Sequence, residues 1–359
     1  MSGNSEQTGL SSHPRHDTPG LTISVIMPVY NAVTFLMHSL PPLIGMLRNN
    51  EILEVIVADD SSTDETARVA AGMGARVIAS GGRLGPGGAR NCAASIATGD
   101  IVWFVDADVV VEQDAVHELI AGFSEPGVVA VFGSYDDRPP AGNFLSQYKN
   151  LIHHYYHNRT DREASTFWSG CGAVRKEAFM QAGGFDVELF KRPSVEDIEL
   201  GYRLRDAGGR ILLLPELRGT HLKEWRLLNL LHTEIFCRAV PWSRLMLTRT
   251  GLQDVLNVSR GERMRAALAV MLPVTITCVL LDLVLWWVPF VTGVLISAAN
   301  RRLFAFFYRR KGAGFAFLAT LFHQFYYLYS SAAFMWVWLE TRILRLHRKR
   351  VSTTASTSG

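Results

Sequence analysis

Two aspartates follow an apolar run in the first third of the chain. Residues 101–105 (IVWFV) are long enough for a buried strand and too short for a helix, and Asp106 and Asp108 come directly after them. Because side chains alternate along an extended backbone, both carboxylates can point the same way from the strand's carboxyl end. Carboxylate pairs of this kind suit Mg²⁺ or Mn²⁺ and let the metal hold a diphosphate. The spacing predicts a divalent-metal site, with two solvated loop aspartates as the alternative.

The elements around this strand predict an α/β fold with a doubly wound sheet. Earlier apolar runs indicate strands at 21–27, 54–58 and 75–79, separated by helical stretches. Such a β-α-β-α-β series forms a mostly parallel sheet with helices on both faces. Ligands of these sheets bind beyond the carboxyl ends of the strands. The polar residues expected at that edge are Tyr30, Asn31, Asp59, Asp60, Asp106 and Asp108.

The glycine-rich loop at 81–91 (GGRLGPGGARN) lacks the dinucleotide-binding pattern. It follows the third strand and has no G-x-G-x-x-G spacing, which excludes a nicotinamide site. A flexible connection is one interpretation of the loop. The functional candidate is Arg90, a cation at the start of a helix expected over 89–97, where it could meet phosphate.

Composition narrows the class of protein. The chain has 359 residues, with 36 Lys and Arg against 33 Asp and Glu, and this net charge of +3 gives no support to nucleic-acid binding. Its four cysteines show no C-x-x-C spacing, so we expect neither a zinc site nor disulfides. Residues 1–20 are polar and lack the apolar core of a signal peptide, which predicts a disordered tail and a cytoplasmic domain after it.

Four stretches together resemble the nucleotide-sugar half of the family-two glycosyltransferases of the GT-A fold, in their membrane-anchored bacterial type. These stretches are PVYN (28–31), VADDSSTDET (57–66), GGARN (87–91) and FVDADV (104–109). One residue departs from the family pattern, since Ser61 stands where the family usually has glycine. The departure affects a turn and leaves the carboxylates in place.

The resemblance implies roles around the nucleotide. Asp60, or Asp59 beside it, would bind the nucleobase, while Asp106 and Asp108 would hold the ribose and the metal diphosphate. A carboxylate suits the ring N–H of uracil, which favours a UDP-sugar, but it can also pair with guanine. The remaining nucleotide-sugar contacts expected are Pro28, Tyr30, Asn31 and Arg90.

An acidic pair, Glu196 and Asp197, stands where a helix is expected to begin after Ser194. One arm of a helix cap is the alternative for Asp197. By the resemblance, Asp197 would accept the proton of the acceptor hydroxyl and Glu196 would support it. A positioned base accelerates such a step by about 10²–10⁴-fold. The mechanism implied is one in-line displacement with inversion at the sugar carbon.

Further candidates lie in the second half of the domain. The resemblance suggests His221 as a third metal ligand. A helix over 147–159 carries three histidines, for which we expect an aromatic and cationic face toward an acceptor or lipid headgroup and no metal site. Glycines in a strand permit a ligand to approach the backbone closely. The acceptor-binding candidates are Gly170 and Gly172 and, by the resemblance in position to an interfacial helix of the family, Arg238 and Trp242, although the usual Q-x-x-R-W sequence is absent.

Long apolar runs follow residue 263. A helix over 264–300 would be about 54 Å long, too long for one crossing of a core about 30 Å thick, so we expect a hairpin near 282–289. Residues 301–311 alternate charged and aromatic side chains like an interfacial helix, and 315–339 could span again. Basic clusters flank that last segment and leave the topology open. We expect two or three crossings.

These patterns predict four regions and one function. The regions are a disordered tail at 1–20, a GT-A domain at 21–245, interfacial and transmembrane helices at 246–348 and a second disordered tail at 349–359. The expected protein is a multi-pass inner-membrane, metal-dependent, inverting glycosyltransferase of hexosyltransferase type. It would move a sugar from a nucleoside diphosphate to a hydroxyl of a lipid or lipid-linked saccharide. A polyprenyl-phosphate acceptor and a non-catalytic nucleotide-sugar-binding membrane partner are the alternatives.

Overall fold

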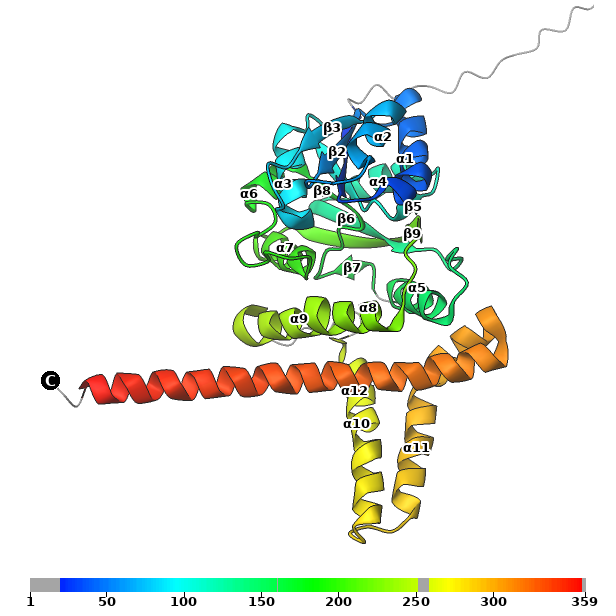
Figure 1. Cartoon of the computed structure of the whole chain (residues 1–359), viewed down its shortest axis with the longest axis vertical. Coiled ribbons are helices and arrows are strands. Elements are labelled where there is room, and N and C mark those ends of the chain that lie inside the picture. Colours follow the sequence, from blue (N-terminus) through cyan, green and yellow to red (C-terminus); the bar gives the residue numbers. More distant parts are fainter. Residues whose placement is uncertain (1–19, 160, 251–257, 357–359) are drawn as a thin grey trace, which may run out of the picture.

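The computed structural model describes residues 20–159, 161–250 and 258–356. The tail predicted at 1–20 falls, except for its last residue, outside this part of the chain. A mixed sheet with helices on both faces forms the upper body in Figure 1, and a set of long helices lies beneath it.

In the described residues, nine strands make one sheet in the order β3-β2-β1-β4-β8-β6-β9-β5, with β7 paired to β9. The strands of the first half are β1 (Ile23–Val29), β2 (Glu54–Asp59), β3 (Arg76–Ala79), β4 (Ile101–Val105) and β5 (Val109–Val111). Those of the second half are β6 (Val128–Tyr135), β7 (Glu163–Ala164), β8 (Cys171–Arg175) and β9 (Arg210–His221).

The expectation of a mostly parallel sheet is correct for β1 to β4, and the rest of the sheet is mixed, with β6 parallel to β9 and β5 antiparallel to it. In the first part, β1 pairs in parallel with β2 and β4, and β2 with β3, whereas β8 runs antiparallel to both β4 and β6. The cause is the connection from β6 to β8, which begins and ends at the same edge of the sheet. A chain that does not cross to the opposite edge must return antiparallel.

Helices connect and cover these strands. In the first half they are α1 (Val33–Arg48), α2 (Thr66–Met73), α3 (Gly85–Ile96) and α4 (Ala115–Phe123). In the second half they are α5 (Phe144–His157), α6 (Lys176–Gln181) and α7 (Glu196–Asp206). The helix expected at 89–97 begins four residues earlier, because Pro86 occupies its first turn, where a missing N–H costs no hydrogen bond.

A continuous helical stretch then leads away from the sheet. It consists of α8 (Leu227–His232), the π-helical turn η1 (Thr233–Ala239), α9 (Val240–Leu245) and a second π-helical turn η2 (Met246–Thr250). In Figure 1 this stretch lies between the sheet domain and the longest helix of the protein.

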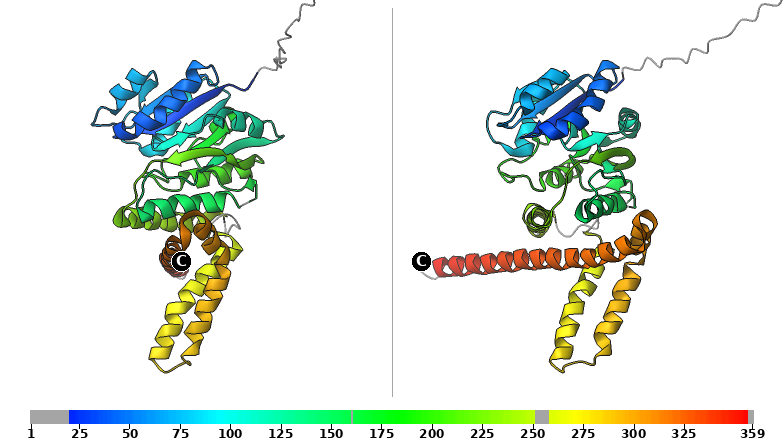
Figure 2. Two further views of the ribbon diagram at one scale, coloured as in Figure 1. Left: turned by 90° about the vertical axis from the view of Figure 1, so that its right-hand side faces the viewer. Right: turned by 45° about the vertical axis from the view of Figure 1, so that its right-hand side comes forward.

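The predicted hairpin in the apolar region is present. It comprises α10 (Arg260–Leu280) and α11 (Trp287–Ala299), and it projects away from the sheet domain in all three views (Figures 1 and 2). Within the described residues, α10 alone is long and apolar enough to cross a membrane. The next helix bends from α11 by 61°, and the two qualify only if they are taken together as one broken span. Multiple crossings therefore receive no support beyond these two segments.

The last helix, α12 (Arg301–Ser356), combines the segments expected at 301–311 and 315–339. The two parts meet at Gly312, whose φ of 82° breaks the regular helix between them. The backbone stays helical through 349–356, where a disordered tail was expected. Arg, Leu and Lys, the common residues before this point, have high helix propensity and allow a helix to continue.

Buried polar contacts join α5 to the apolar helices. The Tyr156 hydroxyl donates to Glu262 of α10 at 2.9 Å, and the Tyr148 hydroxyl lies 2.8 Å from Nδ1 of His323 in α12. Phe307 of α12 packs beside Tyr148 in the same apolar cluster. These contacts fix the hairpin and α12 against the sheet domain.

Candidate active site

The carboxyl ends of β1, β2 and β4 bring the predicted nucleotide-binding residues to one edge of the sheet. Asn31 follows β1, Asp59 ends β2 and Asp106 follows β4, and the three strands are parallel neighbours. Pro28 differs from these residues, because it is a buried residue within β1, opposite Ala58. It shapes the floor of this edge.

Asp60 supports the glycine-rich loop. Its carboxylate accepts hydrogen bonds from the Ser80 hydroxyl at 2.7 Å, the Leu84 N–H at 2.8 Å and the Gly85 N–H at 2.9 Å, and the residue is buried. Asp59 has a lighter role, since its carboxylate accepts one long bond from the Ser62 N–H at 3.3 Å. Of the two aspartates predicted to bind the nucleobase, Asp59 therefore has the carboxylate with fewer hydrogen bonds within the protein.

Asn31 and Tyr30 form the rim of the same edge. The Asn31 side chain accepts from the Thr63 N–H at 2.8 Å, and its φ of 49° places it in the left-handed region that asparagine tolerates. Tyr30 is 41% exposed, and the Arg83 guanidinium lies 4.3 Å from its ring centroid. An exposed ring beside a cation suits the stacking of a base near phosphate. Arg83 is not among the residues predicted from the sequence, although its place in the glycine-rich loop was a usable signal.

Arg90 lies between the donor side and the acidic pair. One of its terminal nitrogens, Nη2, is 2.5 Å from Asp106 Oδ1, and the other, Nη1, is 3.8 Å from Glu196 Oε1. The side chain is only 4% exposed, and its Nε and Nη1 have no hydrogen-bond partner within the described part of the chain. Buried donors without partners are unfavourable in the absence of an acceptor. They suit a phosphate oxygen.

The end of β9 places His221 beside Asp108. Val109 pairs with His221 in the β5–β9 ladder, and His221 Nε2 lies 3.5 Å from Asp108 Oδ2. Burial opposes ionisation of Asp108, but the hydrogen bond from His221 and the charges of His221 and Lys223 hold its pKa below the usual value. The other face of His221 stacks on Tyr135 at 4.4 Å between ring centroids.

The three-ligand metal site of Asp106, Asp108 and His221 stays a prediction. No three His, Cys, Asp or Glu side chains converge on a metal position in the described residues. The reason is that Asp106 is paired with Arg90 while Asp108 contacts His221. Burial raises the pKa of Asp106, and the Asp108 charge raises it further against the opposing effect of Arg90. A hard cation would relieve this repulsion, so the two carboxylates fit a divalent metal by their chemistry.

The acidic pair begins α7, close to the predicted position. Asp197 Oδ2 accepts from the Ser169 N–H at 3.2 Å and Oδ1 from the Ile198 N–H at 2.8 Å, and the residue is half-buried. Glu196 is buried, and burial together with the Asp197 charge raises its pKa to about 7, against the opposing charge of Arg90. Burial also raises the pKa of Asp197. A carboxylate that binds its proton more tightly is a better base.

Two acceptor candidates are explained by packing within the protein. A Cβ on Gly172 would lie 2.2 Å from the Trp168 carbonyl oxygen, and one on Gly170 would lie 2.5 Å from the Trp168 ring. These glycines make room for Trp168, so no ligand can approach Gly172 from that side. The Gly170 carbonyl has a separate role, because it accepts from the Asp106 N–H at 3.0 Å and fixes the turn after β4.

The two candidates from the helix below the sheet have different surroundings. Trp242 is buried, and its indole N–H donates to the Tyr202 hydroxyl of α7 at 3.2 Å, so it packs beneath the acidic pair and does not face an open site. Arg238 is 45% exposed, and its Nη1 contacts Glu234 at 3.2 Å. Burial works against its charge, yet Glu234, Tyr135 and Asp197 raise its pKa. Arg238 thus belongs to the electrostatic surroundings of Asp197.

Two of the α5 histidines, His153 and His157, do not contribute to the cationic face that the sequence suggested. Burial lowers the pKa of His157 to about 4 and that of His153 well below its usual value. Both are therefore neutral, and the His153 ring lies tilted against Tyr135 at 4.3 Å between centroids. The aromatic column that they form with Trp168 and His221 was missed, because its members come from four separate segments.

Comparison with known proteins shows similarity to glycosyltransferases. Residues 24–183 match the family described as Glycosyl transferase family 2. The pre-mycofactocin glycosyltransferase of Mycobacterium tuberculosis is 29% identical over 219 residues, which are 56% of this chain and 44% of that protein. The O-antigen chain rhamnosyltransferase WbaN of Salmonella anatum is 27% identical over 240 residues, covering 62% of this chain and 74% of that protein. This chain thus spans less than half of the first relative.

A solved structure shares the fold over most of the chain. The mannosyltransferase PcManGT of Pyrobaculum calidifontis, solved with GDP-mannose and Mn²⁺, aligns with a TM-score of 0.57 at 18% identity and covers 88% of both chains. At this identity the likeness shows the fold, which is that of the GT-A glycosyltransferases. The match to glycosyl transferase family 2 covers residues 24–183, which are less than half of the chain and lie within the sheet domain.

Proposed function

We propose that this protein is a metal-dependent, inverting glycosyltransferase of hexosyltransferase type. It moves a sugar from a nucleoside diphosphate sugar to a hydroxyl of a lipid or lipid-linked saccharide at the membrane. One observation carries the proposal: the buried Arg90 contacts Asp106 on the donor side and lies next to Glu196 at the start of α7. A single cation therefore lies between the residue proposed to bind the donor and the acidic pair proposed to include the catalytic base.

The donor is expected along the edge formed by β1, β2 and β4. Asp59 contacts the nucleobase, Tyr30 and Arg83 cover it, and the unpartnered Nε and Nη1 of Arg90 face the diphosphate. Held by Asp106 and Asp108, a divalent cation would neutralise charge on the departing diphosphate. A UDP-sugar is favoured, since a carboxylate pairs well with the ring N–H of uracil.

The acceptor hydroxyl gives its proton to Asp197. Hydrogen bonds from the Ser169 and Ile198 N–H groups orient this carboxylate, and burial raises its pKa and so its affinity for the proton. The hydroxyl oxygen then attacks the sugar carbon from the side opposite the diphosphate, which inverts that centre. Arg90 stabilises the charge on the departing nucleotide.

The exposed hairpin supports action at a membrane. Its tip carries Leu280, Leu281, Leu283 and Trp286, each more than 60% exposed. An apolar surface of this extent marks a membrane or protein contact. We infer that the hairpin enters the inner membrane while the sheet domain stays on the cytoplasmic side.

Two alternative functions fit the acidic pair less well. A polyprenyl-phosphate acceptor is already ionised and needs no base, so the acidic pair at Glu196 and Asp197 argues against it. A non-catalytic nucleotide-sugar-binding membrane partner would have no use for the raised pKa of this pair.

Calorimetric binding of nucleoside diphosphates to the detergent-solubilised chain tests the proposal. Tight binding of one nucleotide with Mn²⁺, lost in the presence of a chelator, is the expected result. Absence of binding by every nucleotide, in protein shown to be folded, would exclude the glycosyltransferase function.

A further inference from the structure

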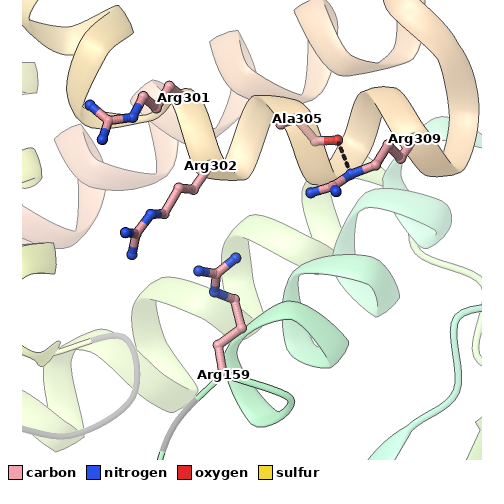
Figure 3. A pocket seen from close by; sticks show the side chains of 5 residues that line it. All are labelled: Arg159, Arg301, Arg302, Ala305 and Arg309. Atoms are coloured by element: carbon pink, nitrogen blue, oxygen red, sulfur yellow. Dashed lines mark hydrogen bonds between the residues drawn. The ribbon is translucent and has the colours of Figure 1, made fainter.

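A cavity of about 430 Å³ lies between the end of α5 and the first part of α12. Four arginines line it together with Ala305, and they are Arg159, Arg301, Arg302 and Arg309. Figure 3 shows Arg159 pointing from the end of α5 toward α12, with Arg302 and Arg309 on the opposite side of the space. We call this feature the four-arginine cavity.

None of the four guanidinium groups has an acidic partner in the described parts of the chain. Arg309 Nε donates to the Ala305 carbonyl at 3.2 Å, and the Arg159 guanidinium lies 5.0 Å from the Tyr155 ring centroid. Their neighbours differ, because Arg310 pairs with Asp137 and Arg265 pairs with Glu262. Like charges that converge without a counter-charge repel one another, and a bound anion removes this repulsion.

The position of the cavity indicates the source of the anion. Arg301 and Arg302 come two and three residues after the end of α11, where the hairpin returns to the sheet domain. The 13 residues of α11 are about 20 Å long, which is less than the hydrocarbon core of a bilayer. With the exposed apolar tip of the hairpin in that core, its base, and with it the cavity, lies at the level of the lipid headgroups.

The chemistry of the arginines indicates the group that is bound. A guanidinium binds phosphate through two parallel hydrogen bonds, and several guanidiniums can share the oxygens of one phosphomonoester. We propose that the four-arginine cavity binds the phosphate group of an anionic lipid headgroup and so fixes the sheet domain against the membrane. The inference rests on the proposed action at the membrane, and it adds a ligand site outside the nucleotide-binding edge.

The test uses the full chain in a neutral detergent and measures its Tm during titration with short-chain phosphatidic acid. We expect Tm to rise by about 2–4 °C near saturation. Short-chain phosphatidylcholine should have no effect, because its choline cation is repelled by the arginines. An equal response to both lipids would overturn the proposal.

A pair of double variants separates the cavity from general charge. Arg301→Gln with Arg302→Gln should weaken the apparent affinity for phosphatidic acid at least about tenfold, since each basic side chain at an anionic surface contributes about fivefold. Lys311→Gln with Arg342→Gln removes the same charge from exposed positions of the same helix outside the cavity and should retain most of the affinity. Equal losses in the two variants would show a nonspecific effect and contradict the site.

Two further measurements identify the source of the bound phosphate and show that the variant is folded. If inorganic pyrophosphate raised Tm equally and lost its effect in the Arg301 and Arg302 variant, the ligand would be a soluble phosphate and the lipid assignment would be wrong. Nucleotide binding is measured on the same preparations and should be unchanged in the variant, which shows that it is folded. Loss of nucleotide binding in the unaltered chain would contradict the proposed function separately from the lipid result.

Discussion

Arg90 Nη2 lies 2.5 Å from Asp106 Oδ1, although Arg90 belongs to α3 and Asp106 follows the next strand, β4. The carboxylate that the sequence offers to a metal is thus already neutralised by a cation of the protein. On the other side, the same guanidinium is 3.8 Å from Glu196.

Replacing Arg90 by methionine should destabilise the protein. Glu196 is buried and would lose its nearby cation, while Asp106 stays about one-third exposed and is partly solvated. We expect a loss of about 2–3 kcal/mol, below the range for a fully buried pair. Urea unfolding measures the change. Arg68→Met, which breaks the exposed pair with Glu65, is the control and should leave stability nearly unchanged.

Asp197→Asn should abolish transfer and keep the donor bound. An amide of the same size preserves the contact with Ser169 but cannot accept the acceptor's proton. We expect kcat to fall by about 10²–10⁴-fold with little change in the dissociation constant of the nucleotide. Single-turnover rates and calorimetry provide the two values. A variant with near-normal turnover would remove Asp197 from the role of base.

Asp108→Asn should weaken the binding of the nucleotide only when metal is present. The change removes a carboxylate proposed to hold the cation and leaves the contacts of the base intact. We expect binding in Mn²⁺ to weaken by at least about tenfold, since even outer-shell partners of a metal contribute that much. With a chelator, the variant and the unaltered protein should bind equally. Asp206→Asn, an exposed change at the far end of α7, serves as the matched control.

Asp59 and Asp60 should respond differently to the same substitution. Asp60→Asn disturbs the bonds from Leu84 and Gly85 and should cost about 1–3 kcal/mol of stability. Asp59→Asn should leave stability nearly unchanged and weaken the affinity for UDP about tenfold, because one charged hydrogen bond to the nucleobase is lost. Thermal unfolding and calorimetry distinguish the two. Equal nucleotide affinity in Asp59→Asn and the unaltered chain would point to Asp60 as the base contact.

Stability should fall with rising pH because of Glu196. Its pKa rises from 4.5 to about 7 on folding, chiefly through burial, so the folded protein holds this proton more tightly than the unfolded chain. The resulting stabilisation is complete below about pH 4.5 and is lost as pH rises through about 7. The change is of the order of 3 kcal/mol. Glu196→Gln should remove this slope from urea unfolding measured at several pH values, and an unchanged slope would contradict the assignment.

The strands and the donor edge could be predicted from the sequence because their signals are local. An apolar run that ends on Asp106 defines β4, and the same reasoning located β1, β2 and the carboxylates that follow them. The break near Asp282 between two apolar helices was likewise predictable, because a single helix of that length exceeds the bilayer. Each of these conclusions depends on residues that are neighbours in the chain.

Contacts between distant segments decided the rest. The sequence does not distinguish Asp60 from Asp59 as the nucleobase contact. In the structure, the loop at 80–85 folds back beside Asp60, whose carboxylate accepts hydrogen bonds from it. The missing side chain of Gly172 could make room for a ligand or for a neighbouring part of the protein. In the structure, Trp168 occupies this space. The four-arginine cavity joins Arg159 to residues of α12 more than 140 positions away. Burial and pairing arise when the chain brings such segments together, so spacing along the sequence cannot report them.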